Sequence, residues 1–133
     1  MEEINLESLE IYRLGRELSR AAWQIYQPMD WHTRKIIGDQ FITAIDSYSA
    51  NVAEGHGRFH YLDRAKFLFN ARGSLFEGLH WLNTIAERGM IKAGNDHECR
   101  ILIQTIAPKL NGFISSQFER NSSKTKSTTA PNI

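Results

Sequence analysis

The feature that most constrains the fold of this chain is the recurrence of apolar residues at steps of three and four along four segments. The segments cover about residues 6–26, 30–55, 62–88 and 95–118. Such spacing places the apolar side chains on one face of an α-helix. Four helices of about 20 residues with short connections predict an all-α fold, an antiparallel up-down four-helix bundle.

The predicted core residues are those that repeat on the apolar face of each segment. In the first two segments they are Ile11, Leu14, Leu18, Ala21, Ile25, Ile37, Phe41, Ala44, Ile45, Tyr48 and Val52. In the last two segments they are Leu68, Ala71, Leu75, Leu79, Leu82, Ala86, Ile103, Ile106, Leu110, Phe113, Ile114 and Gln117. Because every segment has such a face, the helices are expected to share one hydrophobic core.

Residues that break or cap helices lie at the ends of these segments. They are Pro28, Asp30 or Thr33, Gly55 with Gly57, Gly89, and Asn95 or Asp96. Proline removes a backbone donor, glycine suits a helix C-terminus, and Asp, Asn or Thr caps an N-terminus. Trp31 is expected to pack near the start of the second helix, and Pro108 is expected to kink the fourth.

The third segment carries more apolar surface than a single bundle needs. Its apolar arc is about twice the ~100° that a helix of a monomeric bundle presents, because Phe69 and Phe76 flank the central row. Gly73 lowers helix stability by about 1 kcal/mol relative to alanine, and small residues of this kind permit close helix approach. We therefore expect a homo-oligomer whose interface includes Phe69, Phe76 and Gly73.

Composition limits the class of protein. The 133 residues carry a net charge of +1 and are 41% hydrophobic, which excludes whole-chain disorder and argues against generic phosphate neutralisation. The single cysteine, Cys99, excludes an intramolecular disulfide scaffold. No apolar run reaches the ~18 residues of a membrane helix, and the acidic N-terminus does not resemble a signal peptide. A cytoplasmic protein with no membrane partner is expected.

The chain is expected to form one domain. Residues 1–120 are predicted to form the helical bundle, since they hold nearly all of the apolar residues. Residues 121–133 are mostly Ser, Thr, Lys and Asn, and this composition predicts a disordered polar tail.

The sequence contains no recognisable arrangement of residues for catalysis or metal binding. His97 and Cys99 are two residues apart, so they point apart on a helix, and Cys99 is interpreted as a packing residue. His56 and His60 have helical ligand spacing, but Gly57 interrupts the helix and no third ligand has clear spacing. We therefore expect no enzymatic activity, no metal site, no cofactor and no small-molecule substrate.

Two charged residues are predicted to form a structural ion pair. Arg72 projects into the apolar sector of the third helix, and Glu54 lies beside the turn that leads into that helix. A guanidinium in such a position has to be paired, so Glu54 and Arg72 are expected to tie the two helices together. The alternative interpretation is that Arg72 faces a polyanion.

Basic residues are the candidate nucleic-acid contacts. Arg13, Arg16 and Arg20 recur at helical spacing and form one row on the first helix. A row of this kind is more often a solvated face than a polyanion contact, and both interpretations stay open here. The other candidates, near the predicted helix ends, are Arg34, Lys35, Arg58 and Arg64.

Blocks of sequence on all four segments resemble a known family. They are Leu9-Glu10-Ile11-Tyr12, Asn51-Val52-Ala53-Glu54-Gly55-His56-Gly57-Arg58, Ala71-Arg72-Gly73-Ser74-Leu75 with Glu77, and Leu110-Asn111-Gly112-Phe113-Ile114. Over about residues 6–118 the chain is similar to four-helix-bundle proteins, among them those encoded in intervening sequences of bacterial large-subunit ribosomal RNA genes.

The resemblance implies a closed antiparallel bundle that assembles as a ring, often a homopentamer, with no established catalytic activity. The family is also similar to accessory proteins of diversity-generating retroelements, whose bundle rings bind a reverse transcriptase and its RNA. Members commonly carry paired arginines on the second helix, whereas here Gln40 is followed by Phe41, Ile42 and Thr43. This departure weakens the expectation of RNA binding, and Ile42 and Tyr48 are expected to enlarge an apolar contact instead.

The sequence supports two functional hypotheses. The first is a non-enzymatic oligomeric bundle protein that binds RNA or a ribonucleoprotein, such as a reverse transcriptase–RNA complex. The second is a protein–protein interaction scaffold with no nucleic-acid partner, in which grooves between bundles hold a segment of another protein. Salt separates them, because phosphate contacts release counterions and lose affinity steeply with salt, whereas apolar groove binding does not.

Overall fold

The computed structural model describes the backbone of residues 5–129 and the side chains of residues 5–124. Its elements in chain order are η1 (Leu6–Ser8), α1 (Glu10–Tyr26), α2 (Trp31–Thr33), η2 (Arg34–Gly38), α3 (Asp39–His56), α4 (Tyr61–Glu87) and α5 (His97–Thr129). Every regular element in this range is helical, so the all-α prediction is confirmed.

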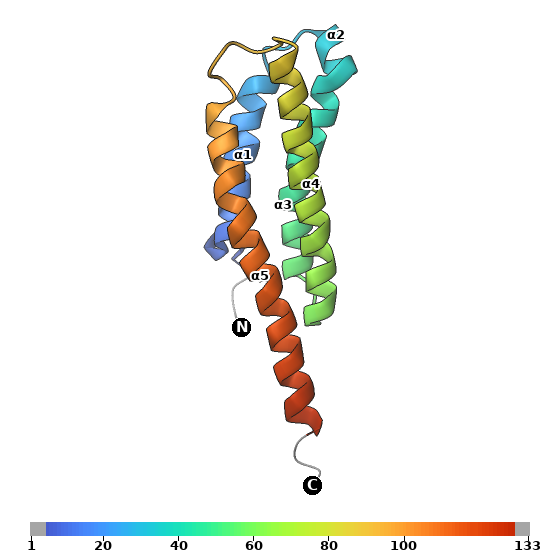
Figure 1. Cartoon of the computed structure of the whole chain (residues 1–133). Helices are drawn as coiled ribbons and strands as arrows, with labels where there is room; N and C mark the ends of the chain where they lie inside the picture. The colour runs from blue at the N-terminus through green and yellow to red at the C-terminus, as the bar shows by residue number, and fades with distance from the viewer. Residues whose placement is uncertain (1–4, 130–133) are drawn as a thin grey trace.

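The long helices lie side by side. The short helix α2 and the π-helical turn η2 continue without a break into α3, so residues 31–56 form the second long helix. Both α1 and α4 pack against α3 and α5, and the α3–α4 contact is the most extensive. Figure 1 shows the connections after α1 and after α4 at one end of the molecule, and the α3–α4 connection at the other. The last turns of α5 extend past that second end.

One hydrophobic core lies between the helices. Every core residue predicted in the first two segments is buried, from Ile11 on α1 to Val52 on α3. Most of those predicted in the last two segments are also buried, while Leu79, Ala86 and Phe113 are only partly so. Burial is worth about 25 cal/mol per Å² of apolar surface, so these faces hold the helices together.

Tyr48 is a central residue of this core. Its side chain is fully buried, and its hydroxyl donates a hydrogen bond of 2.8 Å to the Ile11 carbonyl oxygen. Its burial confirms the core prediction from helical spacing, and the apolar contact of its ring is with α1 inside the chain. Ile42 is partly buried and packs against the same core.

The second long helix begins earlier than its apolar pattern indicates. The Asp30 carboxylate accepts the Thr33 backbone N–H at 2.8 Å, so Asp30 is the N-cap and the helix starts at Trp31. This backbone hydrogen bond lowers the pKa of Asp30. Trp31 does not pack near the helix start as expected, because its side chain is 72% exposed. Asp30 places it on the first turn, ahead of the buried Ile37.

Glycines end α3 and α4 as predicted. Gly57 follows the last residue of α3, and its N–H donates to the Ala53 carbonyl at 3.1 Å. Gly89 has φ +64°, a left-handed conformation that favours glycine, and it lets the Met90 N–H reach the Ile85 carbonyl at 3.1 Å. These hydrogen bonds pair backbone carbonyls in the last turns of α3 and α4.

Helix α5 is longer than the sequence pattern predicts. It includes Pro108 without a break in the helix and continues to Thr129. The composition of residues 121–133 predicts a disordered tail, but residues 121–129 continue the helix, and residues 130–133 lie outside the described part. Extending an existing helix adds one backbone hydrogen bond per residue without a new nucleation step. The composition of a segment does not indicate whether a helix precedes it.

Candidate binding surfaces

A surface formed by α4 and α5 carries exposed aromatic rings. Phe69 and Phe76 on α4 are 51% and 46% exposed, and Phe118 on α5 is 45% exposed. The ring centroids of Phe69 and Phe118 lie 6.1 Å apart. We call Phe69, Phe76 and Phe118 the aromatic face. Gly73 lies between the two α4 phenylalanines, and a Cβ there would meet nothing within 4 Å, so the surface is open at that point.

The apolar residues of this surface follow a regular spacing. Leu62 is 50% exposed, and Leu62, Phe69 and Phe76 follow one another at intervals of seven residues along α4. An apolar repeat of seven residues is the pattern of a helix that packs against another helix. The surplus apolar surface predicted from the third segment is therefore exposed in the single chain.

The predicted ion pair between Glu54 and Arg72 does not form. Glu54 pairs with Arg58 one turn later, and both side chains are about half exposed (52% and 44%). Arg72 donates from Nε to the Asn111 Oδ1 at 3.0 Å and lies 4.8 Å from the Phe76 ring centroid. The prediction placed Arg72 in the buried sector of its helix, but this side chain is exposed and turned toward α5.

The predicted row of arginines on α1 lies on the surface. Arg13, Arg16 and Arg20 are exposed, and we call them the arginine stripe. Arg13 pairs with Glu17 at 3.3 Å, whereas the described side chains include no ion-pair partner for Arg16 or Arg20. Exposed guanidinium groups without a carboxylate partner are available to an anionic ligand.

Trp23 extends the arginine stripe toward the end of α1. Steps of four and three residues join Arg16, Arg20 and Trp23, so they lie on one face of the helix. The Trp23 ring is 46% exposed, and its centroid lies 5.2 Å from that of Tyr26. This aromatic residue was missed in the sequence, although its spacing after Arg20 was the available signal.

Cations and aromatic rings meet where α1 turns into α2. The Arg34 guanidinium carbon lies 4.5 Å from the Tyr26 ring centroid, and the Lys35 Nζ lies 5.7 Å from the Trp31 ring centroid. We call Trp23, Tyr26, Trp31, Arg34 and Lys35 the aromatic corner. The structure thus places the predicted candidate Arg34 beside the partly buried Tyr26 ring and Lys35 beside the exposed Trp31 ring.

The remaining predicted cations lie at the opposite end, around the α3–α4 connection. The Arg58 guanidinium carbon lies 4.6 Å from the Phe67 ring centroid, and the Arg64 Nε donates to the Arg58 carbonyl at 2.6 Å. Arg58 is also paired with Glu54. These contacts hold the turn in place, so Arg58 and Arg64 have structural partners that Arg16 and Arg20 lack.

The sequence blocks on α3 and α4 hold these two helices close together. A Cβ on Gly55 would lie 3.1 Å from the Phe67 Cβ and 3.2 Å from the Arg64 carbonyl oxygen, so only glycine fits without displacement. Further along the pair, the hydroxyls of Ser47 and Ser74 lie 3.0 Å apart and share a hydrogen bond. These block residues therefore have packing roles.

The single cysteine, Cys99, is buried in the core. Burial, with smaller contributions from Glu98 and Asp96, raises the pKa of the Cys99 thiol to about 12, so this cysteine stays protonated. Among the side chains of residues 5–124, no three His, Cys, Asp or Glu residues gather as metal ligands would. No helix in the described range is long and apolar enough to cross a membrane.

The sequence of the chain was compared with those of known proteins and protein families. No curated protein matches the chain. The sequence profile of the family described as 23S rRNA-intervening sequence protein matches residues 7–112, a range that runs from η1 through the first half of α5. Because the match covers most of the 133 residues, the chain belongs to the 23S rRNA-intervening sequence protein family.

Proposed function

We propose that this chain is a non-enzymatic protein that assembles with copies of itself and binds RNA. The observation that carries the RNA proposal is the arginine stripe, where Arg16 and Arg20 are exposed on one face of α1 and have no carboxylate partner among the described side chains. The family name associates its members with 23S rRNA. A structured RNA or a ribonucleoprotein, such as a reverse transcriptase–RNA complex, is the proposed partner.

The aromatic face supports self-association. Soluble monomers rarely expose large contiguous apolar patches, and such patches mark interaction sites. Phe69 and Phe118 are in ring contact, Phe76 lies two helical turns along α4 from Phe69, and Gly73 between them leaves room for a side chain of another copy. We propose that closed up-down bundles meet at this face and form a ring, for which five copies are expected from the family resemblance.

Self-association is tested by light scattering, at moderate and at high salt. The wild-type chain is expected to give a mass several times 15.3 kDa that does not change with salt, because the contact is apolar. Phe69→Ser/Phe76→Ser is expected to lower that mass. The matched control is Phe59→Ser, which changes an 81% exposed phenylalanine outside the aromatic face and should keep the wild-type mass.

A wild-type monomer would contradict this part of the proposal. The aromatic face would then be free for a different protein, which favours the scaffold hypothesis. A wild-type oligomer whose mass is unchanged in Phe69→Ser/Phe76→Ser would show that the copies meet elsewhere.

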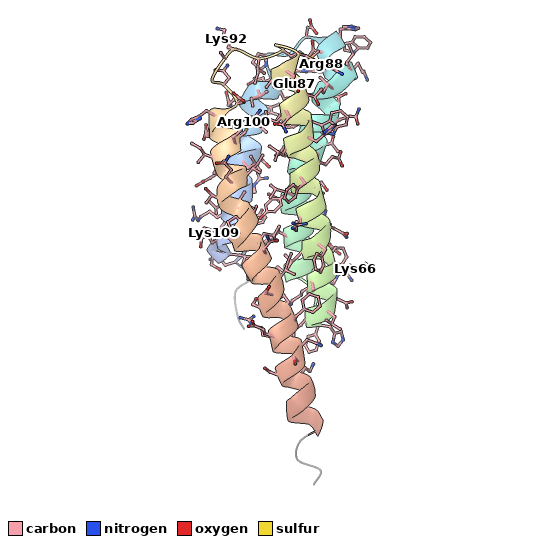
Figure 2. The ribbon with its side chains drawn as sticks, in the orientation of Figure 1. Lys66, Glu87, Arg88, Lys92, Arg100 and Lys109 are labelled. Carbon is pink, nitrogen blue, oxygen red and sulfur yellow. The ribbon has the colours of Figure 1, made fainter. Side chains whose placement is uncertain are left out.

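RNA binding is tested with a labelled RNA hairpin that carries a single-stranded overhang, titrated at several salt concentrations. We expect affinity to fall steeply with salt, and Arg16→Ala/Arg20→Ala to weaken binding and to reduce the salt slope by about 2. The matched control is Lys66→Ala/Arg88→Ala, which removes an exposed cation on α4 and another at the C-cap of that helix (Figure 2). Salt-insensitive binding, or equal losses in the two double variants, would contradict the proposal.

A further inference from the structure

We propose that the aromatic corner is a stacking platform for unpaired bases, so that the chain prefers single-stranded RNA to a duplex. This inference rests on the proposed RNA-binding function and names the form of RNA. Its structural basis is the continuation of the arginine stripe on α1 into the exposed Trp23 ring near the end of the same helix, followed by the exposed Trp31 ring at the start of α2.

The two tryptophan rings of the aromatic corner are largely exposed to solvent. Trp31 is 72% exposed and Trp23 is 46% exposed, so much of both rings contributes no burial to the core. A large exposed indole is uncommon on a soluble surface and is enriched where proteins bind partners. The Lys35 ammonium, 5.7 Å from the Trp31 ring centroid, places a positive charge beside the most exposed ring of the corner.

The backbone holds these rings in a defined place. The π-helical turn η2 carries Arg34 and Lys35, and π-helical turns occur frequently at functional sites. Gly38, the last residue of η2, packs so closely that a Cβ would lie 2.7 Å from the Met29 Sδ. The Tyr26 hydroxyl donates to the Asp39 Oδ1 at 2.6 Å, so α1 and α3 are linked directly beneath the corner.

The charges of the corner indicate which part of a nucleotide it contacts. Two carboxylates belong to the same region as the cations Arg34 and Lys35: Asp30 caps the helix that carries them, and Asp39 accepts a hydrogen bond from the Tyr26 hydroxyl, whose ring lies 4.5 Å from Arg34. The formal charges of these four side chains cancel. Asp30 is occupied as the N-cap of α2, and Asp39 accepts the Tyr26 hydroxyl. Phosphates are therefore attracted to the arginine stripe, and the neutral, ring-lined corner suits the bases.

Arg16, Arg20 and Trp23 lie along one helix face, so one RNA strand can contact all three. Arg16 and Trp23 are seven residues apart on one helix face, a rise of about 10 Å at ~1.5 Å per residue. Bases in a duplex are stacked on one another, whereas unpaired bases present their faces to aromatic side chains. A strand held by its phosphates at Arg16 and Arg20 can thus place bases on Trp23 and Trp31.

The test compares a labelled oligouridylate with an RNA duplex of the same length. Base stacking on an aromatic ring is worth about 1–3 kcal/mol, so Trp31→Ala is expected to lower affinity for the oligouridylate about fivefold or more and to leave duplex affinity unchanged. Trp31→Phe is expected to restore most of the loss. Trp31 is largely exposed, so neither change should affect folding, which circular dichroism checks.

The matched control is Phe59→Ala. Phe59 is 81% exposed, and a lysine, Lys124, lies 5.7 Å from its ring centroid, which reproduces the Trp31–Lys35 arrangement away from the arginine stripe. This variant should bind the oligouridylate as the wild type does. A loss in Phe59→Ala with none in Trp31→Ala would overturn the inference and move the site to the α3–α4 connection.

Two further outcomes separate the inference from the proposed function. If both RNAs bind and Arg16→Ala/Arg20→Ala weakens both, but Trp31→Ala changes neither or changes both equally, RNA binding stands and the stacking platform is wrong. If neither RNA binds at low salt, the proposed function fails, and the inference fails with it.

Discussion

At Gly15 the backbone of α1 passes so close to α3 that no side chain fits. A Cβ there would lie 2.5 Å from the Ser49 Oγ and 2.5 Å from the Tyr48 Cε2. The Tyr48 ring is fully buried and is held by its hydrogen bond to Ile11, so it has little room to move. One glycine therefore sets the distance between two helices.

Gly15→Ala is expected to destabilise the protein by about 1–3 kcal/mol, the usual cost of forcing extra atoms into a packed core. Urea unfolding followed by circular dichroism measures the change. Gly112→Ala is the matched control, because a Cβ at this exposed helical position meets nothing within 4 Å. It should raise stability by about 0.5–1 kcal/mol. Equal stabilities for Gly15→Ala and the wild type would contradict the close contact.

Cys99 gives a prediction for alkaline pH. Burial raises its pKa from 9.0 to about 12, so the unfolded chain ionises first as the pH rises. The stabilisation from the neutral thiol is complete below pH 9.0 and is lost as the pH rises toward about 12. Between about pH 8 and about pH 10 the wild type should lose about 1 kcal/mol more of its unfolding free energy than Cys99→Ala.

Urea unfolding at each pH, under reducing conditions, tests this prediction for Cys99. The native thiol should also react slowly with a thiol reagent near neutral pH, because it is protonated and buried. Parallel pH profiles for the wild type and Cys99→Ala would show that the thiol ionises equally in both states.

At the scale of the elements, the contact between α3 and α4 is the most extensive in the molecule. Gly55 lies at one of its close points, against the Cβ of Phe67 and the backbone of Arg64. Neither of those atoms is the end of a flexible side chain, so relief requires a small shift of the helix backbone. This explains the glycine in the Asn-x-Ala-Glu-Gly block as a packing requirement.

Gly55→Ala is therefore expected to cost about 1–3 kcal/mol of unfolding free energy. Gly57→Ala, two residues later, is the matched control. Gly57 has φ −76°, which any residue adopts, and a Cβ there would lie at least 3.5 Å from its neighbours. We expect its midpoint in urea to stay close to that of the wild type. A larger loss for Gly57→Ala than for Gly55→Ala would contradict this account.

At the scale of the whole molecule, the proposed oligomerisation would multiply a modest charge. One chain carries a net charge of +1, but a ring would present the arginine stripe once per copy. Linked copies bind a long polyanion far more tightly than one copy, through a high effective concentration. The near-neutral composition of a single chain is therefore compatible with RNA binding by an assembly.

Phe69→Ser/Phe76→Ser should accordingly weaken RNA binding although its arginine stripe is intact. We expect a loss of about tenfold or more for a long single-stranded RNA, measured by fluorescence anisotropy at low salt. A short oligouridylate that reaches only one copy should bind this double variant as tightly as it binds the wild type. Equal losses for the long and short RNAs would indicate that the aromatic face itself contacts RNA.

The periodicity of apolar residues along the chain was sufficient to predict the helices and most of their core residues. The repeats that predict burial of Leu18, Phe41 and Leu75 depend only on helical geometry, which is local. Capping follows from local chemistry as well, as the positions of Asp30 and Gly89 confirm. Membership of the family was also recognisable in the sequence, from the blocks of residues that resemble the family.

Side-chain partners depended on how the helices are rotated and shifted against one another. Arg72 lies near the centre of an apolar sector in the linear pattern, but the rotation of α4 turns it toward Asn111 on α5. Trp31 is exposed because Asp30 starts the helix nearly two turns before Ile37, its first buried residue. Pairwise contacts across the core arise from packing between distant segments, and helical spacing within one segment contains no information about that packing.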